Sequence, residues 1–371
     1  MTKKKSRRKP TRTRVPAELF RARSESSNVV WPGSGSANTN VVLAFLYQLQ
    51  LSQWWPWAEL ERATFRQLHE IVAFTADTPL YRERLDRAGI DPGVALTPAS
   101  WQQLAPLRVH DLEPFVRHGP IAVPTSHGPD APIVWRDGSR KPALRRPAIT
   151  AFFDAAVRMR ELQWHGRDPG GAVVRVDATH PGAPGSVAGR DGWDTALGCL
   201  GATANRVVLA QTESPTAILA ALRRTGADVL ECSSAVLATL VALAPQTKMP
   251  PLRLVRVHGE TLDDALRAAA ATAFGARVRF HLAHALTGAV AFECGEPGAL
   301  HVQAEHVYVE LVDAQDLAVS PGVTGRLLVT DLHNLRQPVP RFDTGWSARW
   351  GTPCACGRGL PVLELSPGPT A

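Results

Sequence analysis

The segment LRLVRVHGETLDDALRAAAATAF, residues 252–274, decides the fold class of this chain. It begins with a short apolar run that predicts a strand and continues into an alanine-rich helical pattern. Similar apolar runs occur at residues 172–176, 206–210 and 228–231, and a helical pattern at 215–224 lies between two of them. Short buried strands that alternate with helices favour an α/β layer with mostly parallel strands.

The segments on either side of this layer have different patterns. Residues 59–75 carry apolar side chains at helical spacing, and residues 80–88 form a second helical pattern that Gly89 closes. After Gly288, short alternating or apolar runs lie between turn signals, which predicts a β-rich lobe. We therefore expect a mixed α/β body in three parts: mainly helical at 41–146, α/β at 147–287 and β-rich at 288–371.

The basic character of the chain is confined to its start. The 371 residues carry a net charge of +7, but residues 1–23 hold ten Lys or Arg against Glu18 alone, so the rest of the chain carries −2. Such a run cannot bury apolar surface, and we expect residues 1–40 to be a disordered basic tail and linker. It is a solubilising extension, an arm for nucleic acid or an anionic surface, or an organellar transit peptide.

Cysteine usage and hydropathy bear on the compartment. No apolar run approaches the roughly 18–20 residues that a membrane-spanning helix needs. The chain has five cysteines, an odd number, and no secretory signal pattern, which indicates a reducing compartment such as the cytoplasm.

Four potential metal ligands fall in the predicted β-rich lobe: Cys294, His301, Cys354 and Cys356. Three thiols and one imidazole match the tetrahedral set that holds structural zinc, with no open coordination position. Cys354 and Cys356 are separated by one residue, which is closer than the common CxxC spacing. The alternative is that these are unrelated buried cysteines and a surface histidine.

Five segments in a fixed order resemble phenylacetate–CoA ligase-like proteins of the adenylate-forming acyl-CoA synthetase superfamily. The resemblance runs from about residue 41 to about residue 365 and implies the large N-terminal domain of these enzymes, with an AMP-binding site. It also places the three cysteines and His301 where family members bind a structural metal. The small C-terminal lid domain of the family has no counterpart in the sequence. The segments are LYRERLDRAGIDP (80–92), VHGETL (257–262), LHVQAE (300–305), TDLHNLRQPVPRFDTG (330–345) and CACGRGLP (354–361).

The resemblance also locates an ATP site that has lost much of its chemistry. The segment that corresponds to the phosphate-binding loop is RDGSRKP, residues 136–142, in which Gly138 and Ser139 are the small residues that suit a backbone anion nest. The flanking charged side chains are unfavourable for such a nest, although Arg140 and Lys141 could hold phosphate through their side chains instead.

Three further positions depart from the family pattern. The tyrosine beside the adenine and the glutamate that binds magnesium correspond to Leu282 and Leu286, and the ribose-binding aspartate corresponds to Trp346. A leucine has no oxygen with which to bind magnesium. The nucleotide-binding positions that keep suitable residues are Gly138, Ser139, Gly259, Glu260, Arg341 and Asp343.

These departures favour a degenerate ligase-like protein that does not adenylate by itself and acts as a binding or scaffold pseudoenzyme. Its ligand would be a small acid or acyl group, and its partner an active relative. The alternative is a divergent acid–CoA ligase that works with a separate lid protein and still uses ATP and magnesium, with His258 and Glu260 as the first residues to mutate. A third hypothesis is nucleic-acid binding through the basic tail. No catalytic residue can be assigned.

Overall fold

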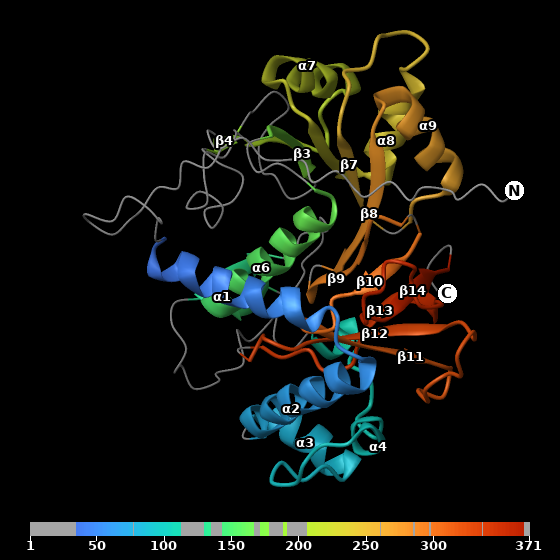
Figure 1. Ribbon diagram of the computed structural model, residues 1–371. Helices are drawn as coiled ribbons and strands as arrows, with labels where there is room; N and C mark the ends of the chain where they lie inside the picture. Colours follow the sequence, from blue (N-terminus) through green and yellow to red (C-terminus); the bar gives the residue numbers. More distant parts are fainter. Residues whose placement is uncertain are drawn as a thin grey trace, which may run out of the picture.

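The computed structural model describes residues 35–76, 78–112, 130–134, 143–166, 171–177, 188–190, 206–259, 261–284, 286–296, 298–335 and 337–366. Over these residues the chain forms a mixed α/β fold in which most of the strands belong to one large sheet (Figure 1). None of the described helices is both long and apolar enough to cross a lipid bilayer. The basic segment at residues 1–34 lies outside the described residues.

The N-terminal part of the body is helical, as predicted. Helices α2, α3 and α4 lie below β11 and β12 in Figure 1, whereas α1 lies beside α6. Gly89 ends α3 in the left-handed conformation at φ 64°. The prediction of a linker was wrong at residues 37–40, because α1 already begins at Ala37. The Ser36 side chain accepts a hydrogen bond from the Thr39 backbone N–H at 3.2 Å, which caps the helix. The helices are α1 (Ala37–Ser52), α2 (Trp57–Thr75), α3 (Pro79–Ala88), α4 (Pro98–Trp101) and the 3-10 helix η2 (Val109–Leu112).

A two-stranded hairpin interrupts the region predicted to be mainly helical. Strand β1 (Asp130–Val134) pairs antiparallel with β2 (Ala143–Pro147). Both strands contain proline, which is depleted from strands, so their composition gave no strand signal. The expected phosphate-binding segment, residues 136–142, lies between them in the sequence and outside the described residues.

The predicted parallel layer is confirmed. Strands β5, β3, β6, β7 and β8 are parallel neighbours in that order, and β4 joins the edge antiparallel to β5. Helix α8 was not predicted, because its sequence SAVLATLVA is apolar on every side and shows no amphipathic period. The elements are α6 (Ala148–Trp164), β3 (Val173–Asp177), β4 (Ala188–Arg190), β5 (Arg206–Ala210), α7 (Pro215–Thr225), β6 (Val229–Ser233), α8 (Ser234–Ala242), β7 (Leu254–His258), α9 (Asp264–Phe274) and β8 (Arg277–His284).

The C-terminal part is β-rich, as expected, and it continues the same sheet. Strand β8 pairs parallel with β7 and antiparallel with β9, so the sheet changes direction at β8. Within the described residues this sheet has twelve strands, in the order β11-β12-β13-β14-β10-β9-β8-β7-β6-β3-β5-β4. The additional strands are β9 (Gly288–Glu293), β10 (Leu300–Val302), β11 (Val307–Val312), β12 (Gly325–Asp331), β13 (Phe342–Trp350) and β14 (Val362–Leu365).

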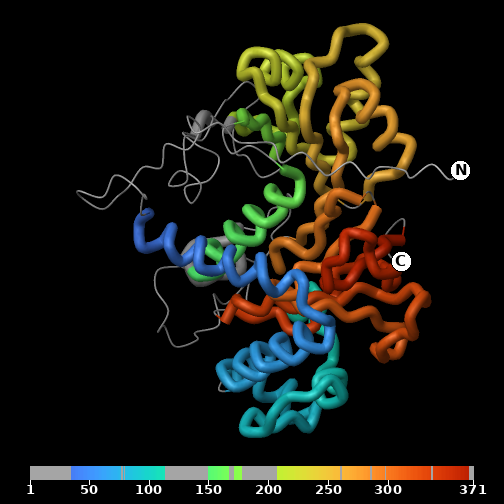
Figure 2. Tube along the Cα trace, viewed as in Figure 1, coloured from blue at the N-terminus to red at the C-terminus, as the bar shows by residue number. Residues whose placement is uncertain are grey.

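Two apolar clusters cover opposite faces of the parallel strands. Val255 and Val257 of β7 pack with residues of α7, α8 and α9, whereas Leu254 packs with α1 and α6. Successive strand residues point to opposite faces, so this division follows from the period of two. Helices α1 and α6 run side by side in Figure 2.

The α6 side of the sheet also holds a buried polar network. Both Glu161 carboxylate oxygens accept hydrogen bonds from Arg256, at 2.9 and 2.8 Å, and Arg256 also donates to Nδ1 of His281. Burial and the neighbouring Arg256 lower the pKa of His281 to about 3. The imidazole is therefore neutral at neutral pH, and in the tautomer with an unprotonated Nδ1 it can accept the Arg256 hydrogen bond.

The low pKa of His281 predicts a pH effect on stability. His281 in the unfolded chain binds a proton near pH 6.5, whereas folded His281 does not do so until about pH 3. The unfolding free energy therefore falls as the pH drops below 6.5, by up to about 1.4 kcal/mol per pH unit for this group. Replacing His281 by Gln keeps an acceptor and removes the titration, so the decline between pH 6.5 and 5 should become shallower.

Urea denaturation at several pH values measures this slope. His110→Gln is the matched control, because the His110 side chain is 68% exposed. Burial also lowers the pKa of His165, to about 4, so part of the slope should persist in the His281→Gln protein. An unchanged slope in that protein would contradict the assigned role of His281.

Candidate functional site

The described residues include only part of the expected nucleotide site. Gly138, Ser139 and Glu260 lie outside them. Gly259 follows the last residue of β7 and has a φ of +134°, a conformation that side-chain-bearing residues rarely adopt. Glycine therefore occupies the position after β7 whose backbone conformation a residue with a side chain would rarely adopt.

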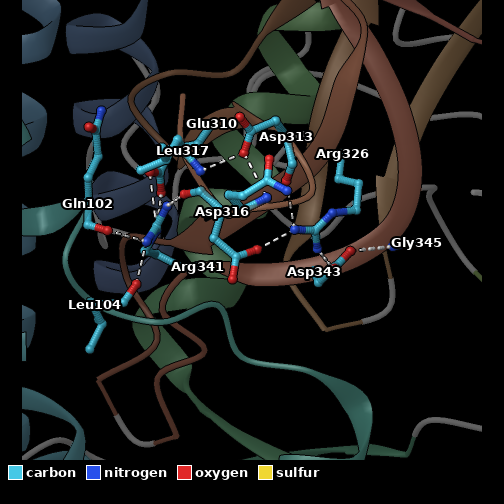
Figure 3. Close-up of polar contacts among 11 residues, drawn as sticks. Gln102, Leu104, Glu310, Asp313, Asp316, Leu317, Arg326, Arg341, Asp343 and Gly345 are labelled. Carbon is cyan, nitrogen blue, oxygen red and sulfur yellow. Dashed lines mark hydrogen bonds and ion pairs between the residues drawn. The ribbon is translucent and has the colours of Figure 1, made fainter. Parts of the chain in front are cut away.

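Arg341, one of the predicted nucleotide-binding residues, is fully buried and bonded to the protein itself (Figure 3). Its Nε donates to Glu310 at 3.2 Å, and its Nη1 donates to the carbonyl oxygens of Gln102, at 2.8 Å, and Leu104. Its Nη2 donates to the carbonyl oxygen of Asp316 at 3.3 Å. All three guanidinium nitrogens thus donate hydrogen bonds to protein acceptors. These bonds connect the helical N-terminal part with β11.

The acceptor Glu310 is itself held in place. It accepts a second hydrogen bond from Nε1 of the buried Trp101 at 2.9 Å. Burial raises the pKa of Glu310, and the Arg341 guanidinium opposes that rise. The charge on Glu310 therefore depends on Arg341.

Asp343 belongs to a neighbouring network in the same close-up. Its carboxylate forms an ion pair with Arg326 and accepts the backbone N–H of Gly345 at 3.1 Å. Arg326 also pairs with Asp316 and donates to the Asp313 carbonyl oxygen at 3.0 Å. The two predicted nucleotide-binding residues are thus close in the fold, and both interact with protein groups.

Apolar residues occupy the positions that the sequence resemblance assigns to the adenine and magnesium contacts. Leu286 is fully buried in a cluster with Leu107, Leu112, Val339 and Phe342. Leu282 is fully buried in the main core. These two side chains are packed by protein atoms and have no oxygen to offer a cation.

Trp346, which the sequence resemblance aligns with the ribose-binding aspartate, is partly buried against the core. The ring of His284 lies 5.5 Å from the Trp346 ring and 5.1 Å from the Phe342 ring, centroid to centroid. The Nδ1 atom of His284 accepts the backbone N–H of Leu286 at 3.2 Å. Aromatic rings and a histidine therefore border the apolar cluster around Leu286.

Polar side chains end three of the parallel strands. Asp177, Ser233 and His258 are the last residues of β3, β6 and β7, and Ser233 and His258 are register partners. Nε2 of His258 is buried and has no hydrogen-bond partner among the described residues. Burial, with Arg175 and Arg256 nearby, lowers the pKa of His258, so the imidazole is neutral near pH 7.

Sequence reasoning singled out His258 but missed Asp177 and Ser233. Each of these two residues ends an apolar run in the sequence, and a polar residue at the end of a predicted strand could have marked it as a candidate site residue. The carboxyl ends of parallel strands form the usual ligand-binding edge of an open α/β sheet.

The predicted cysteine and histidine ligands are brought together. The ligand atoms of Cys294, His301, Cys354 and Cys356 all lie within 4.8 Å of one another. Cys294 Sγ is 3.7 Å from Cys354 Sγ, and Cys356 Sγ is 3.4 Å from His301 Nε2. The other ring nitrogen of His301 lies 3.3 Å from the Leu360 carbonyl oxygen, which suits a histidine that binds metal through Nε2.

The three thiols differ in their electrostatic environment. Burial raises the pKa of Cys294 to about 12 and also raises the pKa of Cys354, whereas hydrogen bonds with Arg358 outweigh burial and lower the pKa of Cys356. A divalent cation would reverse the effect of burial and deprotonate the thiols that bind it. The residues present therefore fit a four-ligand metal site.

The loop that carries Cys354 and Cys356 also contacts the helices. Gly359 donates its N–H to the Gln53 carbonyl oxygen at 2.9 Å, and an added Cβ there would lie 1.8 Å from the Trp55 carbonyl oxygen. The Arg358 guanidinium lies 4.4 Å from the centroid of the Trp164 ring. Only glycine allows this approach, and the loop thereby holds the α1–α2 junction against the sheet.

Comparisons with known proteins bear on the fold alone. The sequence matches no protein-family model, and a search of curated proteins finds no match. The structure is similar to 2-hydroxyisobutyryl-CoA ligase in an open conformation in complex with 2-HIB-AMP and CoA, with a TM-score of 0.68 and 18% identity over 84% of this chain and 70% of that one. The same ligase in its thioesterification state gives a TM-score of 0.66, with 18% identity over 84% of this chain and 69% of that one.

A third structure, the amide bond synthetase McbA from Marinactinospora thermotolerans, matches with 18% identity over 75% of this chain and 53% of that one, but its TM-score of 0.46 is too low to support an argument. Both matches to 2-hydroxyisobutyryl-CoA ligase have TM-scores above 0.5 and show a shared fold. The chain has an adenylate-forming ligase fold.

Proposed function

We propose that this chain binds a small acid, an acyl group or a partner protein on a ligase-type scaffold and does not form acyl adenylates by itself. The observation that carries the proposal is the burial of Leu286 among Leu107, Leu112, Val339 and Phe342. Magnesium requires oxygen ligands in near-octahedral geometry. A packed apolar cluster at the expected magnesium position removes both the ligand and the room for hydrated metal.

The remaining expected contacts support the same conclusion. Arg341 gives hydrogen bonds from all three guanidinium nitrogens to protein acceptors, and Arg326 neutralises Asp343. Phosphoryl chemistry depends on positioned charges that stabilise the transition state. Charges already engaged inside the fold are poor candidates for that task.

The best-supported ligand site is the carboxyl edge of the parallel strands. Asp177, Ser233 and His258 end neighbouring strands, and His258 presents a buried nitrogen that the described residues leave unbonded. A neutral imidazole can donate to or accept from a small polar ligand. The similar ligase is described with an acyl adenylate and CoA, which makes an acid or acyl group a reasonable ligand class here.

The same residues favour a second candidate function. A divergent acid–CoA ligase that works with a separate lid protein would need polar groups at this edge, and His258 would be one of them. Glu260, the other first target for mutation, lies outside the described residues. Pyrophosphate release distinguishes this candidate from a binding protein, because only the ligase produces it. Binding of nucleic acid through residues 1–23 stays a prediction.

We further propose that Cys294, His301, Cys354 and Cys356 hold one structural zinc ion. Four protein ligands would complete a tetrahedral site and leave no position for substrate. Because the loop contacts Gln53 and Trp55, zinc would stabilise the junction between α1 and α2 as well as the β-rich part.

The nucleotide prediction is tested with the full chain. Calorimetry should detect no saturable binding of Mg·ATP, and no pyrophosphate should be released with a panel of aryl and fatty acids. The similar 2-hydroxyisobutyryl-CoA ligase, assayed in parallel, is the positive control. Steady pyrophosphate release that His258→Ala abolishes would support the ligase candidate and overturn the proposal.

The zinc prediction is tested by replacing Cys354 and Cys356 together with Ser. Elemental analysis should show one equivalent of zinc fewer per chain, and chelators should no longer lower the melting temperature. Cys232→Ala is the control, because Cys232 is buried away from the cluster. Equal metal content in the Ser variant and the parent would rule the site out.

A further inference from the structure

A second group of metal-binding side chains lies at one end of the β11–β12 pair. The ligand atoms of His306, Asp331 and His333 lie within 4.8 Å of one another. His306 precedes β11, Asp331 ends β12, and Val307 and Asp331 are register partners. We propose that these three residues bind a divalent transition-metal ion, independently of the cysteine cluster and of the proposed function.

His306 has the environment of a metal ligand. It is fully buried, and its Nε2 lies 3.1 Å from Oδ1 of Asp154 in α6. Neither ring nitrogen of His306 makes a hydrogen bond among the described residues, so the contact with Asp154 is one of proximity. Histidine ligands commonly have a carboxylate beside the ring nitrogen that does not bind the metal, and Asp154 lies at that place.

Asp331 and His333 are positioned together by a turn. The fully buried Asp331 accepts the backbone N–H groups of His333, at 2.9 Å, and Asn334, at 3.2 Å, through Oδ1. An ionised carboxylate has further lone pairs with which to bind a cation. The turn therefore fixes the Asp331 carboxylate relative to the backbone of His333.

Phe153 of α6 orders the two imidazole rings. Its ring stacks on His333 at 3.9 Å and on His306 at 5.5 Å, centroid to centroid. Phe153, Leu332 and His333 also line a cavity of about 380 Å³. His333 therefore borders this cavity, whereas His306 and Asp331 are fully buried behind it.

The donor set indicates which metals fit. Two imidazoles and one carboxylate suit zinc, cobalt, nickel or ferrous iron, whereas calcium and magnesium prefer oxygen ligands alone. Three protein ligands leave a coordination position for water or an exogenous ligand, unlike the closed cysteine set. An ion bound here would join α6 to the β11–β12 end and border the cavity.

Cobalt is the probe that separates the two sites. Thiolate-bound Co²⁺ gives intense charge-transfer absorption, and Co²⁺ on nitrogen and oxygen ligands gives only weak bands. Titration of the metal-free full chain should show two equivalents bound per chain, one with thiolate absorption and one without. Binding of only the thiolate-associated equivalent would overturn the proposal without any variant.

Substitutions show which residues bind the second equivalent of Co²⁺, the one without thiolate absorption. His333→Ala and Asp331→Asn should each remove it and leave the thiolate absorption unchanged, and the asparagine keeps the oxygen that accepts the turn hydrogen bonds. Asp154→Asn should weaken it by about 10- to 100-fold, as loss of an outer-shell partner does. His110→Ala, at an exposed histidine, should change neither equivalent. Retention of the second equivalent in both the His333 and Asp331 variants would place the ion elsewhere.

Discussion

The buried pair of Arg341 and Glu310 is the interaction on which the candidate site depends. Removing one partner of such a pair leaves an uncompensated buried charge, which is costly inside a protein. The backbone of Arg341 also pairs with Leu107, whose N–H donates to the Arg341 carbonyl oxygen at 2.9 Å. Leu107 is in turn part of the apolar cluster around Leu286. The pair therefore helps to position the cluster that stands where magnesium would be expected.

Long-range polar contacts also hold the helices to the sheet elsewhere. Arg160 of α6 pairs with Glu305 at 2.7 Å, and Glu305 accepts the Ser52 hydroxyl at 2.6 Å. Both proposed metal sites lie at comparable junctions: the cysteine loop contacts the α1–α2 turn, and the histidine pair contacts α6. We infer that Arg341 and Asp343, which a ligase would direct at the nucleotide, stabilise contacts between parts of this protein instead. The two proposed metal sites would have the same effect.

The sequence predicts the parallel layer well, because short apolar runs such as residues 254–258 are distinct from the helices between them. It also predicts the cysteine cluster, because cysteine is rare and three cysteines and His301 fall in the same β-rich part of the chain. The sequence does not reveal the ion pair between Arg256, inside an apolar strand, and Glu161, because Glu161 lies on a helix far away in the chain. The sequence also does not reveal the group formed by His306, Asp331 and His333. Their spacing matches no known ligand pattern, and His306 meets the other two residues only through the pairing of β11 with β12.

The central claim is that Arg341 holds the fold and does not bind a nucleotide. Arg341→Met should lower the unfolding free energy by about 3–5 kcal/mol, measured by chemical denaturation, with no effect on binding of Mg·ATP. Arg349→Met, which breaks the exposed pair with Glu364, should cost about 1 kcal/mol or less. The account would be contradicted if the parent bound Mg·ATP measurably and Arg341→Met lost that affinity while remaining as stable as the parent.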